Sequence, residues 1–198
     1  MSKIALSPNA SGTGVFTIAS PNGNTDRTLT LPDEAGTVLT TAGVPASAMP
    51  AGSVIQVVRN STSTEVTLAT VGTWTTIYSA LGTITPSSTS STILGIINTG
   101  WYQGGNGVGS DRLMLQPIRN NTAFGDVNGY FGWYNSGTTI NPMSRGTITF
   151  VDSPNSTSAV NYGFRAYIGA MTANGFMFSY DDGGGDIITE IILMEIAA

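Results

Sequence analysis

The sequence predicts an all-β protein: an antiparallel β-sandwich or jelly-roll-like C-terminal domain, preceded by a short N-terminal β arm. Three observations lead to this prediction. Short segments rich in β-branched and aromatic residues recur along the chain. Residues that favour turns separate them, and Ser, Thr, Asn and Gly together supply 87 of the 198 residues. No amphipathic helix is evident from the spacing of apolar residues, so we expect two packed β-sheets.

Residues 1–42 are predicted to form the N-terminal arm. Residues 27–32 alternate Thr with Leu at the strand period, and the strand-like residues 14–17 are echoed by residues 37–40. Turn residues at 22–24 and 33–36 separate these strands. About forty residues are too few to bury a core without disulfides, metal or partners. We therefore expect the arm to pair between copies in a symmetric homo-oligomer.

Residues 43–52 are predicted to form a linker. The segment from Thr41 to Gly52 contains two prolines, two glycines and several small residues. Neither a helix nor a paired strand runs easily through such a composition. The C-terminal β-sandwich domain is therefore expected to span residues 53–198, and few contacts should cross the linker.

Short strands are predicted throughout the C-terminal domain. They cover residues 53–58, 65–68, 74–78, 93–97, 112–115, 130–134, 146–151 and 162–168. Ser-Thr-Ser turns begin at Ser61, Ser88 and Ser156, where hydroxyl groups are expected to bond turn amides locally. The last segment, residues 187–196, has an acidic spacing that a short helix would allow. Its isoleucine content favours a terminal strand, buried on both faces or packed at a subunit contact.

Composition excludes several chemistries. The chain has no cysteine and no histidine, which removes zinc, haem and iron–sulfur sites as well as Ser-His-Asp and Cys-His catalysis. We expect no enzymatic activity, no catalytic residue and no cofactor. No apolar run approaches the length of a membrane span, and the N-terminus lacks the apolar core of a signal peptide. Synthesis in a cytoplasm without membrane insertion is therefore expected.

The net charge of −5 is concentrated near the C-terminus. Seven basic and seven acidic residues cancel up to Tyr180, and the excess lies in Asp181, Asp182, Asp186, Glu190 and Glu195. A neutral body with scattered arginines has no basic stripe for nucleic acid. The three aspartates lie on a glycine-rich turn and would attract calcium weakly, but Ile192 occupies the position where an EF-hand loop carries glutamate. A solvated turn is the simpler interpretation, and no metal site is assigned.

Several segments carry a family resemblance. The resemblance rests on Thr13–Thr17, Asp26–Thr40, Ile84–Leu94, Phe150–Tyr162 and Ile191–Ala198. The first two resemble the segment that precedes the receptor-binding part of tail fibre proteins from phages of marine and freshwater bacteria, cyanophages among them. The other three resemble the C-terminal domain of the same proteins. Thr92 departs from the family pattern, in which a lysine is expected there.

The resemblance implies a homotrimeric virion protein of the phage tail, assembled in the host cytoplasm. Its N-terminal arm would join other tail or baseplate proteins, and its C-terminal domain would bind a glycan or protein on the host-cell surface. The competing interpretation is a capsid decoration protein, also commonly a trimer of β-domains with an N-terminal arm, since 198 residues are few for a fibre. A tailspike depolymerase would need a far longer chain.

Aromatic residues beside flexible glycines are the expected receptor contacts. Rings with polar edges bury area at low entropic cost. The candidates are Trp101, Tyr102, Asn106, Tyr130, Trp133 and Tyr134. The glycine-rich residues 104–110 lack the lysine of a phosphate-binding loop, so a flexible loop is expected. Strand alternation separates Tyr130 and Tyr134 from Trp133, so one of these two sets is expected in the core; that all the rings pack inside is the alternative.

Overall fold

The computed structural model describes residues 10–15, 17–19, 22–26, 28, 30, 44, 48–104, 110–126, 128–136, 143–170, 175–181 and 187–198. The chain divides into two units, residues 1–38 and 39–198. Within the described ranges, no helix is both long and apolar enough to cross a membrane. The predicted boundaries at residues 42 and 52 stay predictions. Within the second unit Gly52, the last residue of the predicted linker, donates its N–H to the Ala197 carbonyl oxygen at 2.9 Å.

Eleven strands make up the second unit in its described part, and they confirm the all-β prediction. They are β1 (Val54–Thr62), β2 (Val66–Leu68), β3 (Trp74–Ile84), β4 (Thr92–Gly104), β5 (Ser110–Arg119), β6 (Thr122–Ala123), β7 (Phe131–Ser136), β8 (Met143–Asp152), β9 (Val160–Ala170), β10 (Gly175–Phe178) and β11 (Thr189–Ile196). Every strand predicted in residues 53–198 overlaps one of them. The strands predicted in residues 1–42 lie mostly outside the described residues, and residues 14, 15, 17, 28 and 30, which are described, are not in strands. The terminal segment is a strand and not a helix, whereas β6 and β10 were not predicted.

The strands form two antiparallel sheets whose order is that of a jelly roll. Sheet A has the order β1-β11-β4, with β8 on the far side of β4 and with β10 and β2 extending it. Sheet B has the order β3-β9-β5, with β6 and β7 beyond β5. The pairs β1–β11, β3–β9, β4–β8 and β5–β7 are therefore nested from the outside of the chain inwards. This nested pairing of eight long strands defines a jelly roll.

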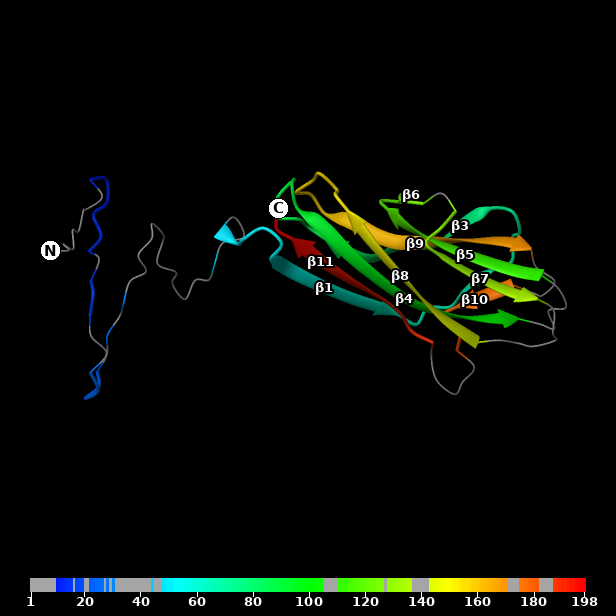
Figure 1. Cartoon of the computed structure of the whole chain (residues 1–198), viewed down its shortest axis with the longest axis horizontal. Helices are drawn as coiled ribbons and strands as arrows, with labels where there is room; N and C mark the ends of the chain where they lie inside the picture. Colours follow the sequence, from blue (N-terminus) through cyan, green and yellow to red (C-terminus); the bar gives the residue numbers. More distant parts are fainter. Residues whose placement is uncertain are drawn as a thin grey trace. The chain divides into compact units, whose positions relative to one another are not determined.

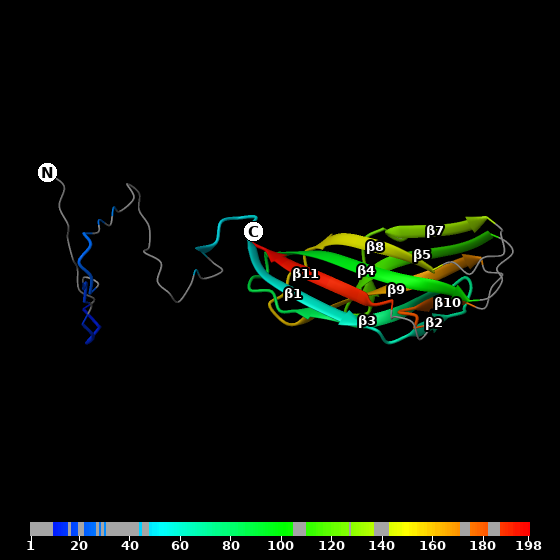
Figure 2. The same ribbon diagram turned by 90° about the horizontal axis from the view of Figure 1, so that it is seen from below.

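The sandwich has two distinct ends (Figure 1). At one end β1 begins and the chain terminates after β11, whereas β4, β7 and β9 end at the opposite end. We call the latter the distal end. The strand registers agree with the figure. Gly104 at the end of β4 pairs with Gly175 at the start of β10, and Ser136 at the end of β7 pairs with Ser110 at the start of β5, so β10 and β5 begin at the distal end. Figure 2 shows β8, β4, β11 and β1 side by side in sheet A.

Aromatic pairs between the sheets fill the core. The ring of Phe150 in β8 stacks on Tyr162 in β9 at 5.4 Å between centroids, and Phe164 in β9 meets Phe178 in β10 edge to face at 5.6 Å. Around them lie alternate aliphatic residues of each strand, among them Ile97, Leu113, Leu115, Ile148, Ile191 and Leu193. The period-two pattern thus places one face of each strand in the core.

The Ser-Thr-Ser turns behave as predicted. In each turn a hydroxyl oxygen accepts a hydrogen bond from the backbone N–H two residues later: Thr62 Oγ1 from Thr64 at 3.1 Å, Ser88 Oγ from Ser90 at 3.2 Å, and Ser156 Oγ from Ser158 at 3.0 Å. These local bonds satisfy amides that leave the sheet ladder where a strand ends.

A buried carboxylate joins two of the segments on which the family resemblance rests. Glu195 of β11 is fully buried. It accepts hydrogen bonds from the Ser87 backbone N–H, the Ser87 and Ser91 hydroxyl groups and Gln56 Nε2, each at 2.6 Å. Burial alone raises the pKa of Glu195, but these donors outweigh it and hold the pKa below its ordinary value. The carboxylate therefore fastens the segment between β3 and β4 to β1 and β11.

Candidate receptor-binding surface

Trp101 corrects the sequence-based expectation. Its side chain has no exposed surface and belongs to the core cluster. The ring meets that of Trp133 edge to face, with centroids 6.5 Å apart. The alternation of β4 points Trp101 towards sheet B, so a surface ligand has no access to it. We therefore withdraw Trp101 from the candidate contacts.

Tyr102 points to the opposite side of β4 from Trp101. Tyr102 is half-buried on the outer face of sheet A, where its ring stacks on Tyr180 with centroids 4.4 Å apart. Asn106 lies outside the described residues, as do residues 105–109 as a whole. The predicted contact segment at residues 100–106 is thus divided between the core, the outer face of sheet A and a part of the chain that the structure does not describe.

Strand β7 separates its aromatic residues as the alternation predicted. Trp133 is half-buried and contacts the core, with its ring 5.7 Å from that of Phe176. Tyr134 points the other way and is 57% exposed, and Tyr130, just before β7, is 40% exposed. The Tyr130 ring lies over Gly125, where an added Cβ would come within 1.9 Å of the Tyr130 hydroxyl oxygen. Two of the six predicted residues therefore present rings at the surface of sheet B.

The same face of sheet B carries residues that sequence reasoning missed. Trp74 of β3 lies beside Tyr167 of β9, its partner in the register, with ring centroids 5.4 Å apart. The guanidinium carbon of Arg165 lies 4.7 Å from the Trp74 ring centroid, a cation–π contact. Arg165 Nε also donates to Gln116 Oε1 at 2.8 Å. These contacts fix the position of the indole beside Tyr167 and Arg165.

These side chains form one surface, which we call the aromatic platform: Trp74, Tyr130, Tyr134, Tyr167, Arg112 and Arg165. The Trp74 ring reaches beyond its own strand to the residue before Tyr130. A Cβ added to Gly129 would lie 3.3 Å from Trp74 Cη2. Exposed Arg112 lies opposite Tyr134 in the β5–β7 register. Flat rings beside guanidinium groups can stack on sugar rings or peptide groups and bond to their oxygen atoms.

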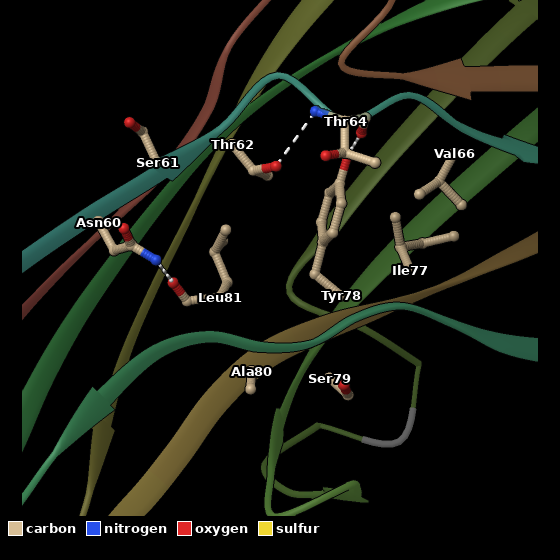
Figure 3. Close-up of a pocket in the computed structure, with 10 residues that line it drawn as sticks. All are labelled: Asn60, Ser61, Thr62, Thr64, Val66, Ile77, Tyr78, Ser79, Ala80 and Leu81. Carbon is tan, nitrogen blue, oxygen red and sulfur yellow. Dashed lines mark hydrogen bonds between the residues drawn. The ribbon is translucent and has the colours of Figure 1, made fainter.

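A second surface feature is a groove of about 430 Å³ between β1 and β3, the strands at which the two sheets meet along one side of the sandwich (Figure 3). Its lining includes the hydroxyl groups of Ser61, Thr62 and Thr64. Side chains cross it: Asn60 Nδ2 donates to the Leu81 carbonyl oxygen at 2.8 Å, and the Tyr78 hydroxyl donates to the Thr64 carbonyl oxygen at 2.6 Å.

A bulge in β3 shapes this groove. Residues Tyr78 and Gly82 pair with Phe164 and Tyr162, so three residues of β3 lie opposite Gly163 alone. The backbone of Tyr78 approaches Gly163 so closely that an added Cβ there would lie 1.8 Å from the Tyr78 carbonyl oxygen. Burial raises the pKa of Tyr78, although hydrogen bonds with Ser179 and Thr189 act in the opposite sense. The groove is therefore uncharged and suits hydrogen bonding to a neutral ligand.

Two of the three aspartates considered for a weak calcium site lie outside the described residues. Asp181 is described and exposed, whereas Asp182 and Asp186 lie outside the described residues. In the part of the chain that is described, no group of three or more His, Cys, Asp or Glu side chains is placed to hold a metal ion.

Comparison with known proteins gives little further information. No family model matches the chain, and no curated protein matches it. Among solved structures, one match is described as the structure of a marine algae virus of the order Picornavirales. It is 12% identical with a TM-score of 0.26, and the alignment covers 100% of this chain and 90% of that chain. A likeness of this size carries no argument, so the jelly-roll assignment rests on the strand pairing.

Proposed function

We propose that the protein is a structural component of a phage virion, a homotrimeric tail fibre whose jelly-roll domain binds the host-cell surface. The observation that carries the proposal is the aromatic platform. It places two exposed tyrosines, a tryptophan and two arginines on one face of sheet B. In a chain with only 10% charged residues, such a face is suited to anchoring a cell-surface glycan or protein.

The resemblance of the sequence to phage tail fibres supports the virion assignment. Residues 1–42 would then join other tail or baseplate proteins, and the platform would face the host. Jelly rolls also occur in proteins with other activities, so the topology alone does not select adhesion. Capsid decoration remains the competing function.

Adsorption of phage to host cells tests the proposal. A virion carrying Tyr130→Ala together with Tyr134→Ala is expected to adsorb at least tenfold more slowly, because both rings leave the platform while neither belongs to the hydrophobic core cluster. The matched control is Tyr102→Ala, which removes a half-buried ring from the other sheet and should adsorb normally. Normal adsorption by the double variant with a thermal midpoint within a few degrees of wild type would contradict the proposal.

Localisation by cryo-electron microscopy of the virion separates the two structural functions. Density for three copies of the jelly roll on the tail is the expected result. Density on the head would favour decoration and would contradict host adhesion, whatever the adsorption assay gives.

A further inference from the structure

The outer face of sheet A carries rows of aliphatic side chains, in contrast to the platform on sheet B. The strands β1, β11, β4 and β8 lie side by side in this sheet (Figure 2), and their registers place each row across all four. One row consists of Val57, Met194, Leu94 and Val151, which are successive partners in the registers of these four strands. In the adjacent row Ile192 and Ile96 lie in the middle, between Arg59 and Thr149. We call this set of residues the aliphatic face.

The aliphatic face departs from what a solvated sheet requires. An antiparallel sheet with one wet face alternates apolar and polar residues. In β11, however, Ile191 and Leu193 point into the core while Ile192 and Met194 point outward. A strand that is apolar on both sides is typical of a sheet covered on both sides.

The row also continues to both edges of the sheet. Val57 in β1 is 59% exposed and Val151 in β8 is 64% exposed. Edge strands usually carry charged side chains on such positions. A polar boundary between the apolar row and solvent is therefore missing at these two positions.

Polar side chains form the next row across the sheet, which consists of Ser61, Glu190, Asn98 and Thr147. Arg59 and Glu190 form an ion pair with 2.7 Å between Nη2 and Oε2, and the guanidinium group together with Asn98 holds the pKa of Glu190 below its ordinary value. Two shallow hollows of about 470 and 250 Å³ open beside them, and Arg145 lines both. An apolar centre with polar groups at its margin is the usual composition of a protein interface.

The size of the face suits the apolar centre of an interface. Rows on one face of a strand lie about 7 Å apart, so two rows across four strands about 4.8 Å apart span roughly 250 Å² before side-chain relief is counted. A stable interface takes about 800 Å² of accessible surface from each partner. The aliphatic face thus supplies the apolar centre of one such contact, and the polar groups at its margin would supply the rest.

We propose that the aliphatic face is the contact between copies of this chain. A second copy is the occupant that fits best, because every copy carries the same face of aliphatic side chains, and three such faces can surround a threefold axis so that each copy contacts both of its neighbours. Homo-oligomers with closed symmetry are also the commonest assemblies. Sheet A then lies inside the oligomer and the aromatic platform of sheet B points outward. The inference rests on the proposed function only for the number of copies, three.

Charged substitutions on the aliphatic face test this contact. Val57→Glu with Val151→Glu places two carboxylates in the row at exposed positions, so the monomer fold should survive. Light scattering and sedimentation at micromolar concentration are expected to give about three times 20.5 kDa for the wild type and 20.5 kDa for the double variant, because an arm of about forty residues is not expected to hold the copies together without this contact. The matched control is Val71→Glu, an exposed valine in the segment before β3, which should assemble like the wild type.

Single cysteines provide a second measurement that does not require disruption of the oligomer. The chain contains no cysteine, so Val151→Cys and Val71→Cys each introduce one thiol. A bulky maleimide is expected to react at least tenfold more slowly at position 151 than at position 71 in the assembled protein.

Four outcomes decide the inference. The inference is supported if the double variant is monomeric and if the Val151→Cys protein is labelled slowly. If these two results come with a wild-type mass of two copies, the contact is supported and the trimer is contradicted. A wild type that stays monomeric at micromolar concentration overturns the inference. A double variant that assembles like the wild type also overturns it. Adsorption and virion location are measured separately, so the proposed function can survive either failure.

Discussion

Glu195→Gln is the substitution that most directly tests how the two ends of the jelly-roll chain are joined. The wild-type carboxylate accepts hydrogen bonds from the Ser87 N–H, the Ser87 and Ser91 hydroxyl groups and Gln56. A glutamine keeps one carbonyl oxygen for the serines, but its NH₂ group faces the Gln56 NH₂ group, so two donors meet. The side chain is buried and cannot exchange these bonds for water.

The cost follows from the hydrogen bonds. A bond to a charged acceptor contributes about 1.5–3 kcal/mol and one between neutral groups about 1 kcal/mol, while a buried donor left without acceptor costs about 1–3 kcal/mol. Part of this loss is offset because a buried charge is removed. We expect the free energy of unfolding to fall by about 3 kcal/mol, which lowers the thermal midpoint by roughly 6–12 °C for a protein of this size.

Thermal unfolding followed by circular dichroism at a fixed protein concentration measures this effect. Because the pKa of Glu195 is lower in the folded than in the unfolded chain, its stabilisation is complete above the unfolded value of about 4.3 and is lost as the pH falls through the folded value. The difference between wild type and variant should therefore be full at about pH 7 and shrink below about pH 4. Glu65→Gln is the matched control, since Glu65 is exposed and its substitution should change the free energy of unfolding by less than about 0.5 kcal/mol. An unchanged midpoint for Glu195→Gln at neutral pH, or a difference that persists in acid, would refute the reasoning.

Three further predictions concern the core and the bulge. Gly163→Ala should lower the free energy of unfolding by at least about 3 kcal/mol in chemical denaturation, because the Tyr78 carbonyl oxygen occupies the space for the new methyl group; Gly132→Ala, which meets open space, should be neutral or stabilising by up to about 1 kcal/mol. Tyr162→Phe should cost about 1–2 kcal/mol, because the hydroxyl group donates to Asp152 Oδ2 at 2.6 Å, and a variant as stable as wild type would contradict that bond. Burial and the neighbouring Asp152 raise the pKa of Tyr162, so tyrosinate absorbance should rise incompletely in the folded protein above about pH 10 and completely in urea. Because Tyr162 ionises first in the unfolded chain, the free energy of unfolding should fall as the pH rises through this range. Coincident titration curves for the folded and the urea-unfolded protein would contradict the pKa shift.

The sequence predicted the strands well because their local signals were strong. Each predicted segment combined β-branched or aromatic residues with flanking turn residues, and the Ser-Thr-Ser turns formed the local bonds expected of them. Strands β6 and β10 were missed because two and four residues are too few to carry a period. The terminal segment illustrates the limit: Glu190 and Glu195, five residues apart, suit a helix in sequence, yet in β11 they lie on opposite faces of a strand.

The candidate site was only partly predictable, for a physical reason. Alternation sorts the residues of a strand into two sets, but it does not say which set meets the other sheet. Tyr134 and Trp133 were correctly separated, whereas Trp101 was expected at the surface and lies in the core. Trp74 and Tyr167 join the platform only because β3 pairs with β9, a long-range register that no local pattern contains.

The nested pairing of the jelly roll also explains why the two outer faces differ. It brings the first and last long strands, β1 and β11, together with β4 in sheet A, so the most aliphatic segments of the chain share one outer face. Strands β3, β7 and β9, which carry Trp74, Tyr134 and Tyr167, fall in sheet B, whereas half-buried Tyr102 lies in β4 of sheet A. If the aliphatic face holds copies together and the platform binds the host, the two properties must be separable. Glutamates at Val57 and Val151 should then abolish assembly and leave the platform residues in place, whereas alanines at Tyr130 and Tyr134 should abolish adsorption and leave the oligomer intact. A double variant on either face that removed both properties without unfolding the domain would mean that the two faces do not act independently.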